Sequence, residues 1–117
     1  MTSLPPAVAT IRLSSDKQLL TIAFEDGFEA ALSAELLRVE SPSAEVQGHG
    51  IDQKQTPLGK GSVRITAIEP VGHYAIRLIF DDGHDTGLYS WALLYDYGKR
   101  ADTLMADYHK RVAELES

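Results

Sequence analysis

Two stretches in which apolar residues recur at every second position, each followed by a turn that contains Asp-Gly, constrain the fold most strongly. The apolar positions are Leu20, Ile22 and Phe24 in the first stretch, and Tyr74, Ile76, Leu78 and Phe80 in the second. A period of two residues is typical of a β-strand with one buried face. The pair Asp26-Gly27 predicts a hairpin with a type I′ turn, in which both central residues have positive φ. Residues 81–85 predict a second tight polar turn, after which 86–89 return as a short strand.

Weaker patterns supply the remaining elements. Strands are predicted over 9–13 and 63–68, and Pro70 indicates that a connection follows the second of these. Ser33 and Ser90 are suited to cap helices over 34–39 and 91–97, and Gly98 is suited to the position just after the second helix. A last helix is predicted over about 101–115 from its apolar stripe. The sequence therefore predicts an α+β fold, with an antiparallel β-sheet of about five or six strands and two or three helices packed on one side, and it shows no internal repeat.

Composition limits the classes of protein that fit. A chain of 117 residues fits a single domain, here 1–117, with a core over about 9–98 and the C-terminal helix over about 101–115. The absence of cysteine excludes disulfides and thiolate metal sites. The net charge of −6 disfavours nucleic-acid binding, since phosphate backbones repel an acidic chain. No secretory signal and no membrane-spanning run is visible, so we expect a cytoplasmic protein.

Residues 41–62 form the longest irregular segment, rich in glycine and proline, and loops of that length tend to be functional or disordered. No catalytic set is convincing. Ser90, His84 and Asp85 lie close together in the sequence, but Ser90 is better explained as a helix cap and no nucleophile elbow is present. We therefore expect a chain without enzymatic activity.

Two segments, 37–49 and 68–91, carry a resemblance to a known family. The second is the more specific, because glycine, histidine and aromatic positions fall together in it, including His73, Gly83, His84 and Trp91. Over about 9–98 the chain resembles the γ-butyrobetaine hydroxylase-like N-terminal domain, also called domain of unknown function 971. In the hydroxylases this domain precedes a catalytic iron/2-oxoglutarate domain and takes part in subunit contacts. Elsewhere it stands alone or is fused to P-loop proteins that handle iron–sulfur clusters.

The resemblance implies a binding or adaptor module, because 117 residues leave no room for the catalytic domain of the hydroxylases. The partner implied is a protein, linked to iron–sulfur or metal-dependent enzymes. The aromatic residues around the helix over 91–97 are candidate contacts for it, because tyrosine and tryptophan are favoured in interface hot spots. They are Tyr89, Trp91, Tyr95 and Tyr97. The alternative is that these residues belong to the core.

The resemblance also implies a zinc module of three cysteines and one histidine. The cysteine positions fall near Ser41, Ser43 and Val46, and the histidine falls on His84. Three of the four ligands are therefore absent, and a thiolate site of that kind cannot form.

A different metal site, for iron or zinc, is an alternative function. A set of two histidines and a carboxylate suits either ion. The candidate ligands are His84, His49, Asp82 and Asp85, with Glu45 nearby in the loop. The competing interpretation is that His84 is a structural turn residue, packed on Trp91 or bonded to a loop carbonyl.

Overall fold

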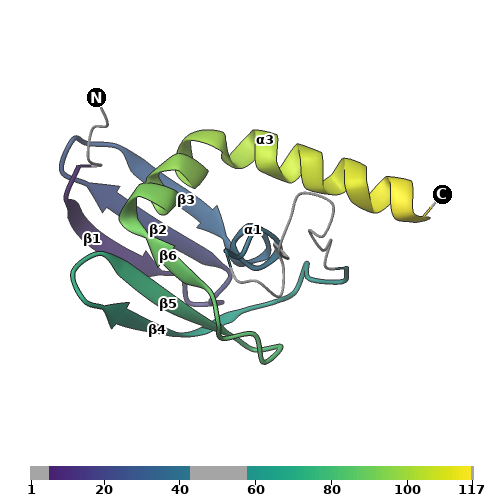
Figure 1. Cartoon of the computed structure of the whole chain (residues 1–117), viewed down its shortest axis with the longest axis horizontal. Coiled ribbons are helices and arrows are strands. Elements are labelled where there is room, and N and C mark those ends of the chain that lie inside the picture. The colour runs from purple at the N-terminus through teal and green to yellow at the C-terminus, as the bar shows by residue number, and fades with distance from the viewer. Residues whose placement is uncertain (1–5, 43–57, 117) are drawn as a thin grey trace.

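Two three-stranded antiparallel sheets and two helices make up the described part of the chain, residues 6–42 and 58–116 of this computed structural model. The elements are β1 (Val8–Leu13), β2 (Leu19–Phe24), β3 (Glu29–Ser33), α1 (Ala34–Val39), β4 (Ile65–Val71), β5 (Ala75–Phe80), β6 (Leu88–Ser90) and α3 (Trp91–Glu116) (Figure 1). The sheets have the orders β1-β2-β3 and β4-β5-β6. No helix in this part of the chain is both long enough and apolar enough to cross a membrane.

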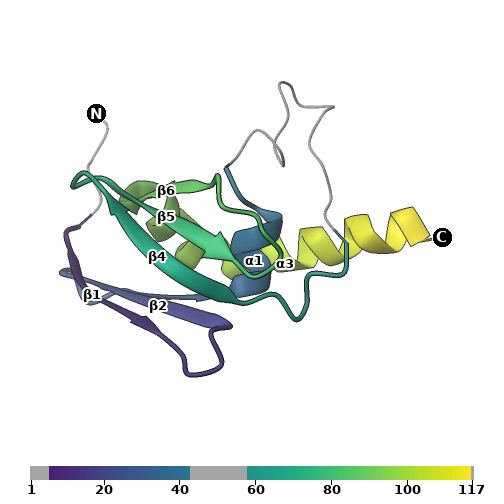
Figure 2. The same ribbon diagram turned by 90° about the horizontal axis from the view of Figure 1, so that it is seen from below.

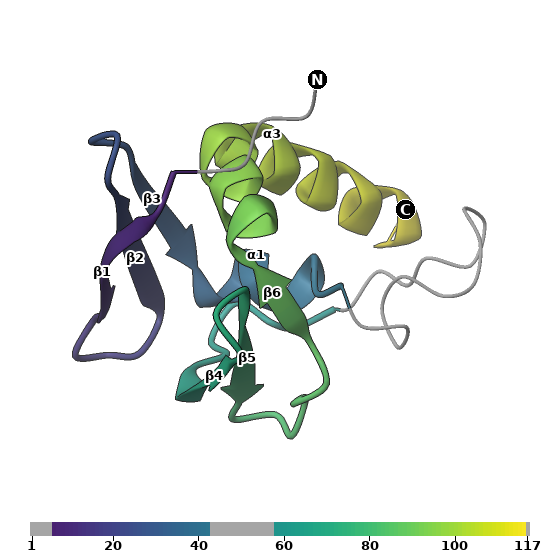
Figure 3. The ribbon, with the colours of Figure 1, turned by 60° about the vertical axis from the view of Figure 1, so that its left-hand side comes forward.

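The predicted α+β class is confirmed, but the single sheet of five or six strands is not what forms. Because α1 begins directly at the end of β3, the chain leaves the first sheet before β4 starts, and β4 then pairs with β5. Strand β5, which contains most of the second alternating stretch, lies at the centre of its sheet, since it pairs with both β4 and β6. Helices α1 and α3 lie on the same side of the second sheet, as two views show (Figures 2 and 3).

The two sheets follow one plan, although the sequence shows no repeat. In each, three strands form a meander, a serine ends the third strand, and that serine caps the helix that follows. Ser33 Oγ accepts the N–H of Leu36, and Ser90 Oγ accepts the N–H of Leu93. Both predicted caps are therefore confirmed, and α1 has the bounds expected for it.

The turn after β2 is a hairpin turn, as predicted, but of a different type. Gly27 has a φ of 91°, while Asp26 does not have the positive φ that a type I′ turn requires. Gly27 N–H donates to Phe24 O, Phe24 N–H donates to Phe28 O, and Asp26 Oδ1 accepts the N–H of Phe28. The aspartate side chain thus replaces one of the backbone contacts that a two-residue turn would make.

The turn after β5 repeats these bonds. Gly83 has a φ of 90° and donates to Phe80 O, Phe80 N–H donates to His84 O, and Asp82 Oδ1 accepts the N–H of His84. His84 therefore occupies in the second turn the place that Phe28 occupies in the first.

Two of the edge strands, β1 and β4, differ from the strands predicted for them. The register shifts between Val8 and Thr10 in β1, and Ile11 is 38% exposed. Strand β4 continues through Pro70, where a connection was predicted. Proline is tolerated there because β4 lies at the edge of its sheet, where a missing N–H need not break a ladder bond.

Helix α3 consists of two helical stretches that meet at a kink, as predicted, but Gly98 does not mark the break between them. Gly98 lies inside it, and the break in helical geometry comes at Arg100, with φ −115° and ψ 16°. Gly98 is needed for packing: a Cβ atom there would lie 2.5 Å from Ala30 Cβ and 2.9 Å from Phe28 Cε2. The missing side chain lets α3 approach β3 closely.

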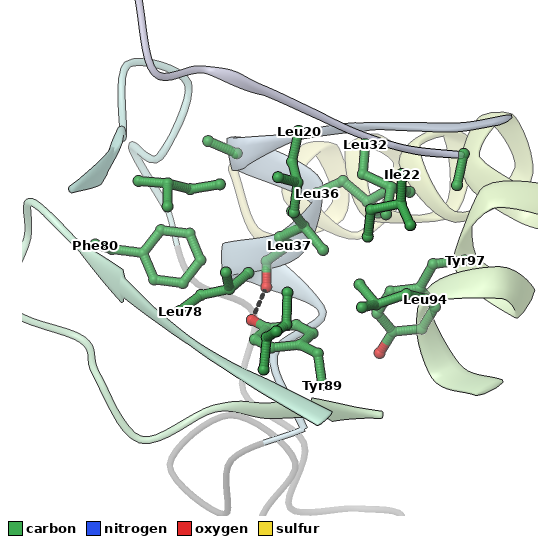
Figure 4. Close-up of a cluster of buried hydrophobic side chains, with 14 of the residues drawn as sticks. Leu20, Ile22, Leu32, Leu36, Leu37, Leu78, Phe80, Tyr89, Leu94 and Tyr97 are labelled. Carbon is green, nitrogen blue, oxygen red and sulfur yellow. Dashed lines mark hydrogen bonds between the residues drawn. The ribbon is translucent and has the colours of Figure 1, made fainter. Parts of the chain in front are cut away.

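The core fills the space between the two sheets and the helices (Figure 4). It is lined by the alternating apolar faces of β2 and β5, together with side chains of α1 and α3. Its largest fully buried members include Leu20, Ile22, Leu32, Leu36, Leu37, Ile65, Leu78, Phe80, Tyr89 and Leu94. Of the second alternating stretch, only Tyr74 lies outside the core, 61% exposed.

Candidate functional site

The end of α1 meets the hairpin formed by β5 and β6, and polar side chains gather at this contact. We call it the α1–hairpin junction; its residues are Leu37, Arg38 and Ser41 from the α1 end, and Asp82, His84, Gly87 and Tyr89 from the hairpin. At its centre Ser41 Oγ and His84 Nε2 are 2.9 Å apart and share a hydrogen bond. Both residues are buried, at 0% and 5% exposure. A buried polar pair of this kind is stabilising only when its hydrogen bonds are made.

Two tyrosine hydroxyls satisfy carbonyl groups at the end of α1, which the helix itself leaves without partners. Tyr89 donates to Leu37 O (Figure 4), and Tyr97 donates to Glu40 O at 2.6 Å. Burial raises the pKa of Tyr89 far above its usual range, and burial followed by the charge of Glu40 raises that of Tyr97 to about 12. Both phenols therefore stay protonated and act as donors.

Gly87 closes the junction from the side of the hairpin. A Cβ atom at Gly87 would lie 2.7 Å from Ser41 Oγ and 3.0 Å from Tyr89 Cε1. The backbone of the hairpin therefore fits directly against the serine hydroxyl, and little space is left around it.

Asp82 forms ion pairs with two cationic side chains, Arg38 on α1 and Lys60 shortly before β4. Arg38 Nε lies 2.8 Å and Lys60 Nζ 2.6 Å from the same Oδ2 atom. Burial raises the pKa of the Asp82 carboxyl, but hydrogen bonds from Lys60, from the N–H of His84 and from Arg38 outweigh burial and hold the pKa well below its ordinary value. The carboxylate thus joins α1, the hairpin and the start of the region leading to β4.

Asp82→Asn should test this contact through its pH dependence. At pH 7 we expect the free energy of unfolding to fall by about 1.5–3 kcal/mol, the contribution of hydrogen bonds to a charged group. The pKa of Asp82 is lower in the folded protein than in the unfolded chain. The stabilisation is therefore fully present above the pKa of the unfolded chain and is lost as the pH falls through the pKa of the folded protein. Urea unfolding at pH 7 and below pH 3 should therefore show the two proteins converging in acid. The matched control is Asp96→Asn, an exposed i,i+4 partner of Arg100, with an expected effect below about 0.5 kcal/mol. If Asp82→Asn lowers the free energy of unfolding by the same amount in acid as at pH 7, the ionised Asp82 carboxylate does not stabilise the contact with Arg38 and Lys60.

The four aromatic candidates are divided between the core and the surface. Tyr89 and Tyr97 are buried at the end of α1, whereas Trp91 and Tyr95 are half-buried. Tyr95 packs edge-on against Phe24, with ring centroids 4.9 Å apart, and its hydroxyl donates to Asp26 Oδ2 at 2.7 Å.

Trp91 stands at the start of α3. Its Nε1–H donates to His73 O at 2.9 Å, so the indole fixes the β4–β5 turn to the helix. The structure therefore gives each of the four aromatic rings a contact within the domain.

The side of the second sheet that faces away from the helices carries a largely apolar surface, which we call the β4–β6 face. Its residues, identified from the strand register, are Ala67, Glu69, Val71, Arg77, Ile79, Leu88 and Ser90; Ala75 shares their register but is buried. Arg77 lies at the centre, bonded to Glu69 and to the backbone carbonyl of Asp85. Leu88, opposite Arg77, is 46% exposed. This surface was not predicted. The sequence indicates it only through the apolar residues Ala75 and Ile79, which alternate with the core residues of the strand over 74–80.

Comparison with known proteins decides the family. The model of the family "Gamma-butyrobetaine hydroxylase-like, N-terminal" matches residues 11–95. The chain belongs to this family. The expected resemblance is thereby confirmed, and no curated protein matches the chain.

Solved structures of similar domains support the fold. Two NMR solution structures are similar to this GBBH-like domain, each with a TM-score of 0.82 and 89% of its own chain covered. They are 45% and 42% identical and cover 100% and 97% of this chain, respectively. A crystal structure of a protein of unknown function from Acidithiobacillus ferrooxidans, of the DUF971 family, is 34% identical with a TM-score of 0.65. It covers 78% of this chain and 91% of its own.

The zinc module implied by the resemblance does not fit the residues that this GBBH-like domain brings together. Two of its four positions, Ser41 and His84, are described, and their side chains are hydrogen bonded to each other. Serine is not among the ligands that zinc takes in proteins. Within residues 6–42 and 58–116 no group of three or more His, Cys, Asp or Glu side chains is placed to hold a metal ion. The positions of Ser43 and Val46 lie outside the described residues.

The alternative metal ligands are found in different surroundings. Asp82 faces Arg38 and Lys60, while the Asp85 carboxylate lies 3.8 Å from Arg77. The ring of His84 lies 6.1 Å from that of Phe80, rather than on Trp91. His49 and Glu45 lie outside the described residues.

Proposed function

We propose that this GBBH-like domain is a non-catalytic protein-binding module that contacts its partner through the β4–β6 face. The observation that carries the proposal is the exposed side chain of Leu88, beside the half-buried Val71 and Ile79, on a sheet whose other side is already filled by the core. An apolar area on one side of a thin sheet is the type of surface that a partner covers.

The outer side of the first sheet provides a contrast. By register it presents five polar residues, Thr10, Arg12, Thr21, Glu29 and Ser33, together with Leu19, Ala23 and Ala31, and an ion pair joins Arg12 to Glu29. That surface is suited to water. The β4–β6 face also has an ion pair, Arg77 with Glu69, but it carries more aliphatic side chains beside it, and arginine is enriched in interface hot spots.

The family supports a role without catalysis. The matching family is defined by an N-terminal domain, and the similar crystal structure is of a protein of unknown function. Iron–sulfur and other metal-dependent enzymes are the partners to test first, because related domains occur fused to such proteins.

The test uses two leucines of similar exposure on opposite sheets. Leu88 is 46% and Leu19 is 42% exposed, so Leu88→Glu and Leu19→Glu should both fold with little loss of stability. Each variant and the wild-type chain would serve as bait in affinity capture from a cell extract, with quantitative mass spectrometry. We expect at least one protein to be lost about tenfold with Leu88→Glu and retained with Leu19→Glu, because a buried charge at an interface costs more than one kcal/mol. Equal capture by both variants would contradict the proposal.

A further inference from the structure

Side-chain contacts hold the two sides of the α1–hairpin junction together. Three contacts join the end of α1 to the hairpin: Arg38 to Asp82, Ser41 to His84, and the Tyr89 hydroxyl to the carbonyl of Leu37. They bridge two segments that are separated by the whole 41–62 region. A structural metal ion typically has the same task, tying distant segments together at one point.

The central pair cannot serve as half of a metal site without being broken. Ser41 Oγ and His84 Nε2, the atoms that would face an ion, bond to each other at 2.9 Å. The backbone at Gly87 fits so closely against Ser41 Oγ that a single added methyl group would lie 2.7 Å from it. An ion between the two side chains would have to push them and the hairpin apart.

The first turn shows that the hairpin itself does not require histidine. Phe28 occupies the equivalent place after Gly27, and its backbone makes the same hydrogen bonds as His84 makes after Gly83. The imidazole is therefore not needed for the turn. Its Nε2 atom shares a hydrogen bond with Ser41 Oγ, so the histidine side chain serves the contact with α1.

We infer that the Ser41–His84 hydrogen bond performs in this chain the structural task of the metal ion that the family resemblance implies, and that the domain folds and stays folded without metal. The junction is then independent of metal supply and of thiol oxidation, since the chain has no cysteine. This inference concerns the fold of the junction and does not depend on the β4–β6 face.

The first test is thermal unfolding of the full chain after removal of metal. We expect the same Tm in EDTA and with excess Zn²⁺ or Fe²⁺, because an ion that binds only the folded state would raise the Tm. Elemental analysis of the untagged protein should find no stoichiometric metal. A Zn²⁺- or Fe²⁺-dependent rise in Tm that disappears in His84→Phe would overturn the inference.

The second test separates the hydrogen bond from the packing around it. We expect Ser41→Ala and His84→Phe each to lower the Tm of the metal-free protein by roughly 4–8 °C, the shift produced by losing one buried hydrogen bond in a small domain. The double variant should lose less than the sum of the two, because both changes break the same bond. Ser62→Ala, at an exposed serine, is the matched control and should leave the Tm unchanged. An unchanged Tm in Ser41→Ala, or additive losses in the double variant, would show that the pair does not carry the junction.

Discussion

Replacing Gly98 with alanine is expected to destabilise the domain by about 1–3 kcal/mol, the usual cost of overpacking a core. In an ordinary helix the same change would stabilise, by up to about 1 kcal/mol. The added Cβ would lie 2.5 Å from Ala30 Cβ and 2.9 Å from Phe28 Cε2, so α3 would have to move away from β3. The movement would open the core along the helix, and this cost should outweigh the gain in helix propensity.

Urea denaturation with far-UV circular dichroism would measure this effect. Gly61→Ala is the matched control, since Gly61 has no positive φ and a Cβ there would meet only Glu35 Oε2, at 3.8 Å. We expect the control to be within about 0.5 kcal/mol of wild type. A Gly98→Ala protein as stable as the control would mean that the helix does not approach the sheet as closely as described.

Tyr89→Phe is expected to cost about 1–3 kcal/mol, because it removes only the hydroxyl that satisfies the buried carbonyl of Leu37. The ring remains, so the loss measures the unsatisfied carbonyl rather than a cavity. Tyr95→Phe provides the comparison: its hydroxyl bonds to Asp26 near the surface, where water can replace it, and the expected loss is below about 1 kcal/mol. Equal losses in the two variants, measured by chemical denaturation, would contradict the buried position of the Tyr89 hydroxyl.

The elements that the sequence predicts well are those whose signals are local. The serine caps of both helices and the bounds of α1 depend on neighbouring residues, and both caps are found as expected. The type of the Asp26-Gly27 turn was wrong, although the hairpin was right. Several arrangements of an Asp-Gly turn join the same strands, and the choice between them depends on how the strands continue.

The features that the sequence misses depend on contacts between distant segments. Gly98 is typical of a residue that ends a helix, but in the structure it lets α3 pack closely against Ala30. Ala30 lies in β3, far from Gly98 in the sequence. The division of six strands into two sheets likewise depends on where α1 and α3 pack, which no strand pattern records. A period of two residues predicts a strand but does not indicate which other strands it pairs with.

Part of the candidate site followed from the family resemblance and part did not. The resemblance singled out Ser41 and His84 as corresponding positions of one site, and the structure places their side chains in contact. The roles of Arg38 and Lys60 were missed, because a charged residue at the edge of a loop gives no sign of the carboxylate it will meet. The β4–β6 face was missed for a related reason: exposure is a property of the packed domain and not of the strand sequence.

The measurement that tests the central claim most directly is site-specific photo-crosslinking from the β4–β6 face in living cells. A photoreactive phenylalanine analogue would replace Leu88 in one protein and Leu19, of similar exposure, in the other. We expect a discrete crosslinked species from position 88, abolished by Arg77→Ala in the same protein, and none from position 19. The absence of a crosslink at 88, or the same species from both positions, would contradict the assignment of this face as the binding surface.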